Sequence, residues 1–275
     1  MSRNRVEGDD ASLNEETRRI WNRIAEWWDG RIGQGNQFQN QLIEPASEKL
    51  LAVQNGDLIL DIACGAGRFT RRLADLGARV VAFDFSENFI RIAKMKALRE
   101  KKDIEWHVID ATDEEQMVSL GQNRFDKAVC TMGLMDIALI DPLFSALSVC
   151  LKKNGHFVFS VTHPCFHSNA AEKYCELAEY GDRPAIRKGV KVSKYRDPFS
   201  YKGIGIVGQP EPQYYFHRSL ETLLSAGFKT GFVVDGFLES CFSPSETAAG
   251  PSLRWQDMSE IPPILVVRMR LLDSH

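Results

Sequence analysis

The sequence contains no long hydrophobic run. None of its segments approaches the roughly 20 consecutive apolar residues that a bilayer-spanning helix needs. The first ten residues, MSRNRVEGDD, are polar, and no apolar stretch with a small-residue cleavage site follows them. These absences argue against a membrane-inserted or secreted protein, so we expect a cytoplasmic protein with no membrane association.

Paired cysteines and an excess of charge are also lacking. The six cysteines are scattered, with no CxxC pair and no spacing typical of metal ligands. This distribution argues against a disulfide framework or a zinc site and favours small buried thiols. The formal net charge of −3 gives no electrostatic reason to expect a nucleic-acid partner, which normally requires a basic face.

The composition that is present is that of a globular protein. The 275 residues are 44% hydrophobic and 26% charged, without an internal repeat or a low-complexity segment. A chain of this length can bury a large core, and we expect one main domain with additions. We predict a disordered N-terminus over 1–11, a helical lid over 12–53, and a main domain over 54–275 that carries an insertion at 163–216.

The first predicted helix follows a capping-box pattern. Ser12 and Glu15 have the spacing of that motif, and the apolar residues behind them recur on one helical face. This face contains Ile20, Ile24, Trp27 and Trp28. The glycines of DGRIGQGNQF, at 29–38, end the helix, and a second helix leads to the first strand of the main domain.

Beyond residue 54, short apolar runs alternate with helical patterns. We predict strands near 57–62, 79–83, 104–109, 125–131 and 155–162, separated by helices at 67–76, 86–101, 113–120 and 141–151. A helix at 217–226 and strands within 228–237 and 262–272 follow. Such alternation is typical of a mostly parallel sheet with helices on both faces. Residues 163–216 show no long periodic run, and we interpret them as an irregular insertion that covers the sheet edge.

A glycine-bracketed turn follows the first predicted strand. The stretch LILDIACGAGRFT, at 58–70, runs from apolar residues into a turn between Gly65 and Gly67. In an open parallel sheet, ligands bind at the carboxyl ends of the strands, where this turn is expected. A dinucleotide fingerprint would need a third glycine at the position of Thr70, which disfavours a nicotinamide-dependent oxidoreductase but keeps it as an alternative.

Four motifs in order give the chain a family resemblance. LDIACGAGR resembles the first motif of the class I S-adenosylmethionine-dependent methyltransferases, in particular the small-molecule types 11 and 25. In ARVVAFDFS the predicted strand ends at Asp84, and in WHVIDATD the next one ends at Asp110. Both strand-ending acidic residues resemble those of that family. FDKAVCTMGLMD resembles the fourth-strand motif. The resemblance is strongest over about residues 50–165, and the final helix and two strands follow it in pattern.

The resemblance implies a fold and a cofactor. It implies an α/β, Rossmann-like seven-stranded sheet with six parallel strands and an antiparallel last strand, and it implies S-adenosyl-L-methionine as the cofactor. Asp84 would accept hydrogen bonds from both ribose hydroxyls and Asp110 would hold the adenine amino group. The cofactor-binding residues expected on this basis are Asp61, Ala63, Cys64, Gly65, Ala66, Gly67, Asp84, Phe85, Ser86, Asp110, Ala111, Thr112, Thr131 and Met132. Both residues also have a structural alternative: Asp84 can interact with the dipole of the helix that follows it, and Asp110 can cap the helix predicted at 113–120.

The methyl acceptor must be bound by other residues. Transfer requires an aligned nucleophile, and a base helps where the acceptor has to lose a proton. The candidate catalytic residues are His163, Tyr215 and His217, and the candidate substrate-binding residues are Trp28, Arg31 and Tyr214. Each has a structural alternative: a turn for His163, a helix cap for His217, an aromatic wall for the tyrosines and core packing for the N-terminal segment.

Several acceptor classes are disfavoured by what the motifs lack. CTMGLMD has no Asn/Asp-Pro-Pro-Tyr signature, which resembles that for amino methylation of DNA, of glutamine or of adenine in RNA, and no double-glutamate loop of arginine methylation is present. Asp136 and Asp141 lack the partner expected in metal-dependent catechol enzymes, so we expect no metal. A small metabolite with an oxygen or nitrogen nucleophile remains, bound by a monomer or homodimer. A non-catalytic S-adenosylmethionine-binding domain is the second alternative.

Overall fold

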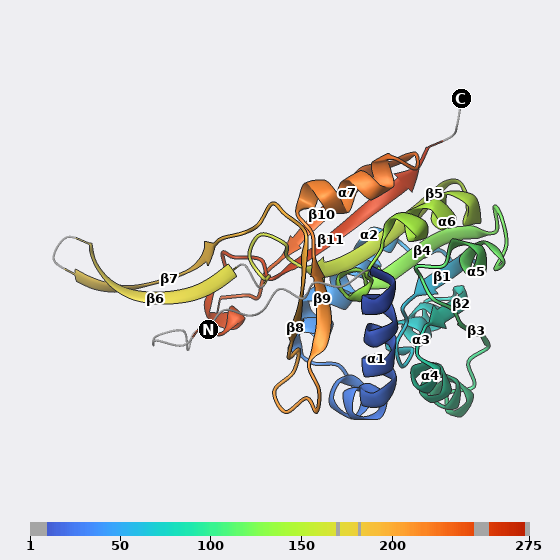
Figure 1. The fold of residues 1–275 in the computed structure, drawn as a ribbon, viewed down its shortest axis with the longest axis horizontal. Coiled ribbons are helices and arrows are strands. Elements are labelled where there is room, and N and C mark those ends of the chain that lie inside the picture. Colours follow the sequence, from blue (N-terminus) through green and yellow to red (C-terminus); the bar gives the residue numbers. More distant parts are fainter. Residues whose placement is uncertain (1–9, 169–170, 181–182, 245–252, 273–275) are drawn as a thin grey trace.

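The fold is built on a central seven-stranded sheet. The computed structural model describes residues 10–168, 171–180, 183–244 and 253–272. The sheet has the order β10-β11-β5-β4-β1-β2-β3 (Figure 1). Its strands are β1 (Leu58–Ile62), β2 (Arg79–Asp84), β3 (Ile104–Val108), β4 (Phe125–Thr131), β5 (Leu151–Thr162), β10 (Phe232–Ser240) and β11 (Ile264–Leu271). Strands β1 to β5 pair in parallel, and β11 is antiparallel to both β5 and β10. Six strands therefore point one way and the last points back, which confirms the predicted fold class.

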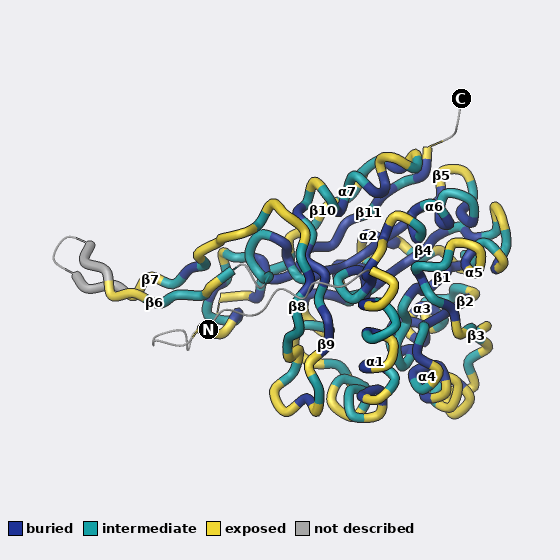
Figure 2. Tube along the Cα trace, viewed as in Figure 1, coloured by how far each residue is buried: buried dark blue, intermediate teal, exposed yellow. Residues whose placement is uncertain are grey.

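Helices cover both faces of the sheet. They are α2 (Glu44–Leu51), α3 (Arg68–Asp75), α4 (Glu87–Arg99), α5 (Glu114–Val118), α6 (Asp141–Cys150) and α7 (Leu220–Phe228). Side chains of successive strand residues point to opposite faces, so Leu60 joins the core beneath α5 to α7 while Ile59 joins the core beneath α2 and α3. Burial on both faces explains the nearly continuous apolar sequence of the central strands (Figure 2).

The strand order reverses between β1 and β4. From β1, the chain moves outward to β2 and β3, and then returns to the other side of β1 to form β4 and β5. At such a reversal the loops that leave the two strands turn to opposite faces and open a crevice at the carboxyl ends. The glycine loop after β1 and the turn after β4, η2 (Leu134–Asp136), therefore border the same space.

The N-terminal region contains a long helix, α1 (Asp10–Ile32), followed by a π-helical turn, η1 (Gln39–Ile43), that continues into α2. The helix begins before the predicted Ser12, with Asp10 in its first turn, where a negative charge favours the helix dipole. Residues 1–9, most of the segment predicted to be disordered, lie outside the described residues. No helix in the described ranges is both long and apolar enough to cross a membrane.

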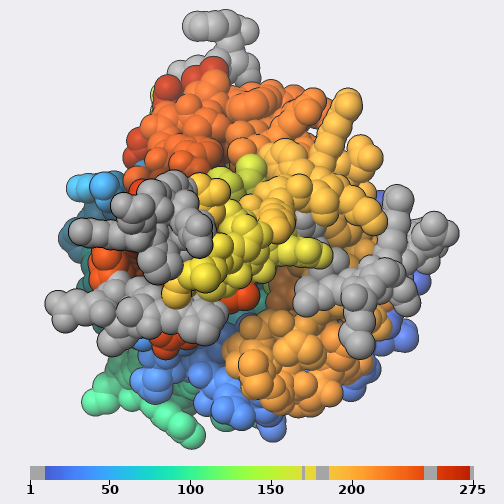
Figure 3. All heavy atoms as spheres, turned by 90° about the vertical axis from the view of Figure 1, so that its left-hand side faces the viewer, coloured from blue at the N-terminus to red at the C-terminus, as the bar shows by residue number. Residues whose placement is uncertain are grey.

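The insertion is more regular than we predicted. It forms one hairpin of β6 (Ala171–Tyr180) with β7 (Arg183–Val192) and a second of β8 (Phe199–Gly203) with β9 (Gln213–His217). The first hairpin extends from the body as an arm, and the loop of the second lies beside the last turns of α1 (Figures 1 and 3). An isolated two-stranded ribbon buries little apolar surface, so its sequence needs no consistent alternation of apolar and polar residues. For this reason the sequence does not predict the strands of the two hairpins.

Candidate active site

The glycine loop bends sharply between β1 and α3. The Cys64 N–H donates to the Phe83 carbonyl at 3.0 Å, and the Gly67 N–H donates to the Cys64 carbonyl at 2.9 Å. Gly65 has a φ of +54° and open space where a Cβ would stand. Gly67, with a φ of +69°, would place a Cβ 2.5 Å from the Trp106 ring. Gly65 therefore leaves room for a ligand, whereas Gly67 allows the loop to pack against β3.

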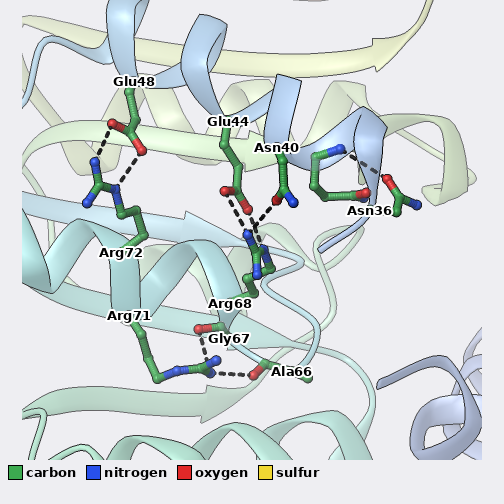
Figure 4. Close-up of polar contacts among 10 residues, drawn as sticks. Asn36, Asn40, Glu44, Glu48, Ala66, Gly67, Arg68, Arg71 and Arg72 are labelled. Atoms are coloured by element: carbon green, nitrogen blue, oxygen red, sulfur yellow. Dashed lines mark hydrogen bonds and ion pairs between the residues drawn. The ribbon is translucent and has the colours of Figure 1, made fainter. Parts of the chain in front are cut away.

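Three arginines of α3 hold the glycine loop and α2 in place (Figure 4). Arg71 is buried and donates to the carbonyls of Ala66 at 2.9 Å and Gly67 at 2.8 Å. Arg68 pairs with Glu44 and Arg72 with Glu48, at 2.6 and 2.7 Å, so α2 is tied to α3. The four-residue spacing of the two glutamates, and of Arg68 and Arg72, places each pair on one face of its helix, which is the local signal for these contacts.

Asp61 lies under the loop at the end of β1. Its Oδ2 accepts a hydrogen bond from the Thr70 hydroxyl at 2.5 Å, and its buried Oδ1 has no partner among the described residues. Burial raises the pKa of Asp61 to about 7. The Thr70 hydrogen bond lowers this pKa, and the nearby charge of Asp84 adds a smaller increase. Thr70 thus uses the position of the missing third glycine to orient a carboxylate. Burial also raises the pKa of the Cys64 thiol, so that side chain is a packing residue and not a thiolate.

Asp84 connects the loop to the next helix. Its Oδ2 accepts from the Gly65 N–H and its Oδ1 from the Ser86 N–H, both at 2.9 Å. Burial raises its pKa to about 6, partly offset by these two hydrogen bonds. Ser86 caps α4 by accepting from the Phe89 N–H at 3.2 Å. Phe85, between them, lines the cavity described below.

Asp110 is held by a residue that the sequence analysis did not identify. Asn14, on α1, donates its side-chain amide to Asp110 Oδ2 at 2.6 Å, while Thr112 donates through both its N–H and hydroxyl to Oδ1. This contact brings the N-terminal helix to the end of β3. A side chain separated from Asp110 by 96 positions gives no local signal in the sequence.

A cavity of about 670 Å³ lies at the carboxyl ends of β1, β2, β3 and β4. Of the predicted cofactor residues, it is lined by Ala63, Cys64, Gly65, Ala66, Asp84, Phe85, Asp110, Ala111, Thr131 and Met132. Asp61, Gly67, Ser86 and Thr112 do not line it and support the wall from behind. Ala63 and Met132 have φ values of +52° and +56°, which are uncommon for residues with side chains. Strained backbone of this kind is concentrated at functional sites.

The charge of the cavity wall is one-sided. Asp84, Asp110 and Asp136 line it, and none of them forms an ion pair among the described residues. Arg68 and Lys202, which also line it, are each paired with a glutamate at 2.6 Å. The wall therefore suits a positively charged ligand and disfavours a pyrophosphate. Within the described ranges no group of three acidic, histidine or cysteine side chains is arranged to hold a metal ion.

The far side of the cavity is aromatic. Trp28 of α1, Tyr201 of β8 and Tyr215 of β9 line it, and the two tyrosine rings stack with centroids 5.3 Å apart. A Cβ on Gly205 would lie 3.0 Å from the Trp28 ring and 2.8 Å from the Tyr215 hydroxyl, so the β8–β9 loop closes tightly over both. Trp28, a predicted substrate-binding residue, and Tyr215, a predicted catalytic residue, therefore both line the cavity.

The other predicted acceptor residues point elsewhere. His163 does not line the cavity: its Nε2 lies 3.0 Å from Glu239 and its Nδ1 accepts from the Cys165 N–H, as expected of a turn residue. Tyr214 donates to Glu16 at 2.7 Å, on the opposite face of β9 from Tyr215. Arg31 stacks over Trp27 and does not line the cavity.

His217 is the last residue of β9 and not a helix cap, because Ser219 caps α7. Its Nε2 lies 2.7 Å from the Tyr195 carbonyl, away from the cavity.

His167, which is not among the residues predicted from the sequence, does line the cavity. Burial lowers the pKa of His167 to about 4, so it is neutral at physiological pH.

The sheet order, the crevice between β1 and β4 and the glycine loop define a class I methyltransferase-type fold. Residues 60–159 match the family described as a methyltransferase domain. The ubiquinone biosynthesis O-methyltransferase of Brucella ovis is 30% identical over 158 residues, which are 53% of this chain and 61% of that protein. The chain thus spans less than two thirds of that relative's length.

Solved structures agree with this result. An S-adenosylmethionine-dependent methyltransferase from Mesorhizobium loti is 26% identical, with a TM-score of 0.64 over 82% of this chain and 96% of that one. The Burkholderia thailandensis 1,6-didemethyltoxoflavin-N1-methyltransferase, solved with its ligand and S-adenosylhomocysteine, has a TM-score of 0.57 at 17% identity, covers 98% of this chain and 94% of its own, and supports the fold alone. Residues 60–159 thus match a methyltransferase domain, and the chain is similar along most of its length to an S-adenosylmethionine-dependent methyltransferase.

Proposed function

We propose that the chain transfers a methyl group from S-adenosylmethionine to an oxygen or nitrogen of a small molecule. The observation that carries this proposal is the cavity at the β1/β4 reversal, where a glycine loop lies beside three carboxylates that form no ion pair with any side chain in the described ranges. The cofactor supplies a methyl group on a positively charged sulfonium, and an acidic wall favours such a charge. A nicotinamide dinucleotide would instead place its pyrophosphate against these carboxylates.

The described residues suggest how the cofactor would be held. Asp84, fixed by two backbone N–H groups, has lone pairs left for ribose hydroxyls. Asp110, oriented by Asn14, faces the cavity where an adenine amino group would need an acceptor. Phe85 offers an apolar face to the base. The unpartnered Oδ1 of Asp61 fits a role beneath the amino-acid portion, either on the loop or on an ammonium through water.

The similarity to O-methyltransferases of ubiquinone biosynthesis supports an oxygen acceptor. A small acceptor also fits the aromatic side of the cavity, because Trp28, Tyr201 and Tyr215 present flat apolar faces with few polar groups. The predicted cytoplasmic location, the monomeric or homodimeric state and the absence of a nucleic-acid partner remain predictions from the sequence.

Calorimetry with the purified chain tests the cofactor. We expect binding of S-adenosylmethionine and S-adenosylhomocysteine, and a loss of about 100-fold in affinity for Asp84→Ala, since hydrogen bonds to a charged group contribute about 1.5–3 kcal/mol each. Asp103→Asn, at an exposed position before β3, is the matched control and should bind normally. Absence of binding by the unaltered chain would refute the proposal.

Labelled methyl transfer then separates an enzyme from a cofactor-binding domain. Incubation of the chain with methyl-labelled S-adenosylmethionine and a metabolite extract should move label into a small molecule. Binding of the cofactor without any transfer would favour the non-catalytic alternative.

A further inference from the structure

Asp136 differs from the other carboxylates of the cavity wall. It ends η2, the short turn after β4, and lines the cavity between the cofactor loop and the aromatic side. Its Oδ1 is buried and has no hydrogen-bond partner among the described residues. An unsatisfied buried carboxylate oxygen is costly, so its retention in a cavity wall points to a ligand that supplies the missing donor.

A buried arginine holds this turn in place. Arg218, directly after β9, donates to the carbonyls of Leu134 at 3.0 Å and of Ile137 and Ala138 at 2.7 Å each. These three carbonyls flank Asp136 on both sides, so its backbone is fixed by a residue just beyond the insertion. Burial lowers the pKa of Arg218 to about 10, which leaves the guanidinium charged at physiological pH.

The insertion also supplies a polar chain behind the aromatic wall. The Tyr215 hydroxyl accepts from Gln213 Nε2 at 3.0 Å, and Gln213 Oε1 accepts from Gln209 Nε2 at 2.7 Å. Gln213 also lies beside Asp136 and opposes the rise in the pKa of that carboxyl group. This polar chain therefore borders one side of the carboxylate, whose Oδ1 has no hydrogen-bond donor among the described residues.

Other titratable groups near the aromatic side are less suited to take a proton. His167 lies between Phe38 and Trp255, with its Nδ1 3.2 Å from the Pro263 carbonyl. Tyr215 is buried, and its pKa is raised by that burial and by the charge of Asp136. Burial, together with the charge of Asp84, likewise raises the pKa of Asp136, which makes its carboxylate a stronger base than an exposed one.

We propose, building on the methyl transfer proposed above, that Asp136 is the catalytic base that binds and deprotonates the hydroxyl of an aromatic acceptor, and that Tyr215 and Tyr201 hold its ring. As the acceptor oxygen bonds to the methyl carbon, the carbon–sulfur bond breaks and its electron pair stays on sulfur. The hydroxyl proton passes to Asp136. The positive sulfonium and the negative carboxylate are neutralised together, so no net charge is created in the buried site.

Asp136→Asn tests the base, because the amide keeps the shape and cannot accept the proton. The probes are catechol and 3,4-dihydroxybenzoate for hydroxyls and aniline and benzylamine for amines, each with methyl-labelled S-adenosylmethionine. We expect transfer to a hydroxyl probe, a fall in kcat/KM of about 100-fold or more in the variant, and loss of the acidic limb of the pH profile. Binding of S-adenosylhomocysteine should stay within twofold of the unaltered chain.

Asp141→Asn is the matched control, since Asp141 is exposed at the start of α6, five positions away, and should leave transfer unchanged. Equal transfer by Asp136→Asn and the unaltered chain overturns the base while the proposed function stands. Transfer to amines alone overturns the acceptor class in the same way. Cofactor binding with neither transfer to nor binding of any hydroxyl probe also overturns the inference. Only a failure to bind the cofactor would refute the proposed function as well.

Discussion

The two sides of the cavity are built differently. On the side proposed to bind the cofactor, the wall residues lie at or just after the strand ends: Ala63 after β1, Asp84 at the end of β2 and Asp110 after β3. On the side proposed to bind the acceptor, Trp28, Asp136 and Tyr215 come from an N-terminal helix, a turn after β4 and an inserted hairpin. The first side is formed by the same strand-to-loop arrangement three times, whereas the second forms only when segments far apart in the sequence come together. Local sequence is therefore informative about the cofactor and much less so about the acceptor.

The helix α1 belongs to both sides. Asn14 contacts Asp110 near its start, and Trp28 lines the aromatic wall 14 residues later, about 21 Å along the axis at 1.5 Å per residue. Asn22, between them, accepts from the Ser86 hydroxyl and the Asn88 N–H, which docks the helix on α4. Changes confined to one end should thus affect one ligand and spare the other.

The largest effect is expected from crowding the glycine loop. Gly67→Ala places a Cβ 2.5 Å from the Trp106 ring and also strains the backbone, at a φ of +69°. Gly56→Ala strains the backbone in the same way, at a φ of +87°, but its Cβ has no neighbouring atom within 4 Å. We expect losses of unfolding free energy of about 3 and about 1 kcal/mol, respectively. Urea denaturation measures both. Equal losses would mean that the loop is not packed against β3 as described.

The next effect is the pH dependence of cofactor binding. The pKa of Asp84 is about 6 in the folded ligand-free protein, and its proposed role requires the ionised form. Binding should release a proton and strengthen by up to about tenfold for each pH unit between 4.5 and 6. Calorimetry in buffers of different ionisation enthalpy counts the proton, and Asp84→Asn should remove the pH dependence.

The stability of the ligand-free chain should change in the opposite direction. Asp61 and Asp84 have folded pKa values of about 7 and 6, above those of an unfolded aspartate, so the folded chain binds more protons. This contribution is fully present below about pH 4 and is lost as pH rises through 6 and 7. Urea midpoints across that range should reveal it in the unaltered chain and less of it in Asp84→Asn.

A smaller effect compares adjacent tyrosines on opposite faces of β9. Tyr215→Phe removes the hydroxyl bonded to Gln213 in the cavity wall and should lower acceptor kcat/KM about fivefold, with cofactor affinity unchanged. Tyr214→Phe removes the hydroxyl bonded to Glu16 and should lower only the unfolding free energy, by about 1 kcal/mol. If both variants altered transfer equally, the division between the two faces would be wrong.

The smallest effect is expected at Asn14. Asn14→Ala leaves Asp110 with its Thr112 hydrogen bonds but without its donor from α1, and we expect cofactor affinity to fall about threefold. The acceptor KM should not change. Arg19→Ala, on an exposed part of the same helix, is the control. A larger change in acceptor KM than in cofactor affinity would show that α1 moves as one unit over both ligands.

Much of the cofactor side could be predicted because its signals are local. An apolar strand, a glycine turn and a strand-ending carboxylate are each readable within about ten residues, and they predict the strand-end positions of Asp84 and Asp110, which line the cavity. His163 and His217 do not line the cavity, because a titratable residue near a strand end can face either side of the sheet. Asp136 was noticed only as a metal ligand without a partner, and its position in the cavity depends on Arg218, 82 positions later.

The sequence by itself determined the sheet, the position of the glycine loop and the carboxylates that follow β2 and β3, since hydrophobic period and turn chemistry act over short distances. Only the tertiary structure decided which of Tyr214 and Tyr215 faces the cavity, where Asp136 points and what α1 touches. Neighbouring strand residues always face opposite sides, but the side that becomes a cavity is set by the elements that dock there. That docking depends on contacts between residues far apart in the chain, which no local pattern encodes.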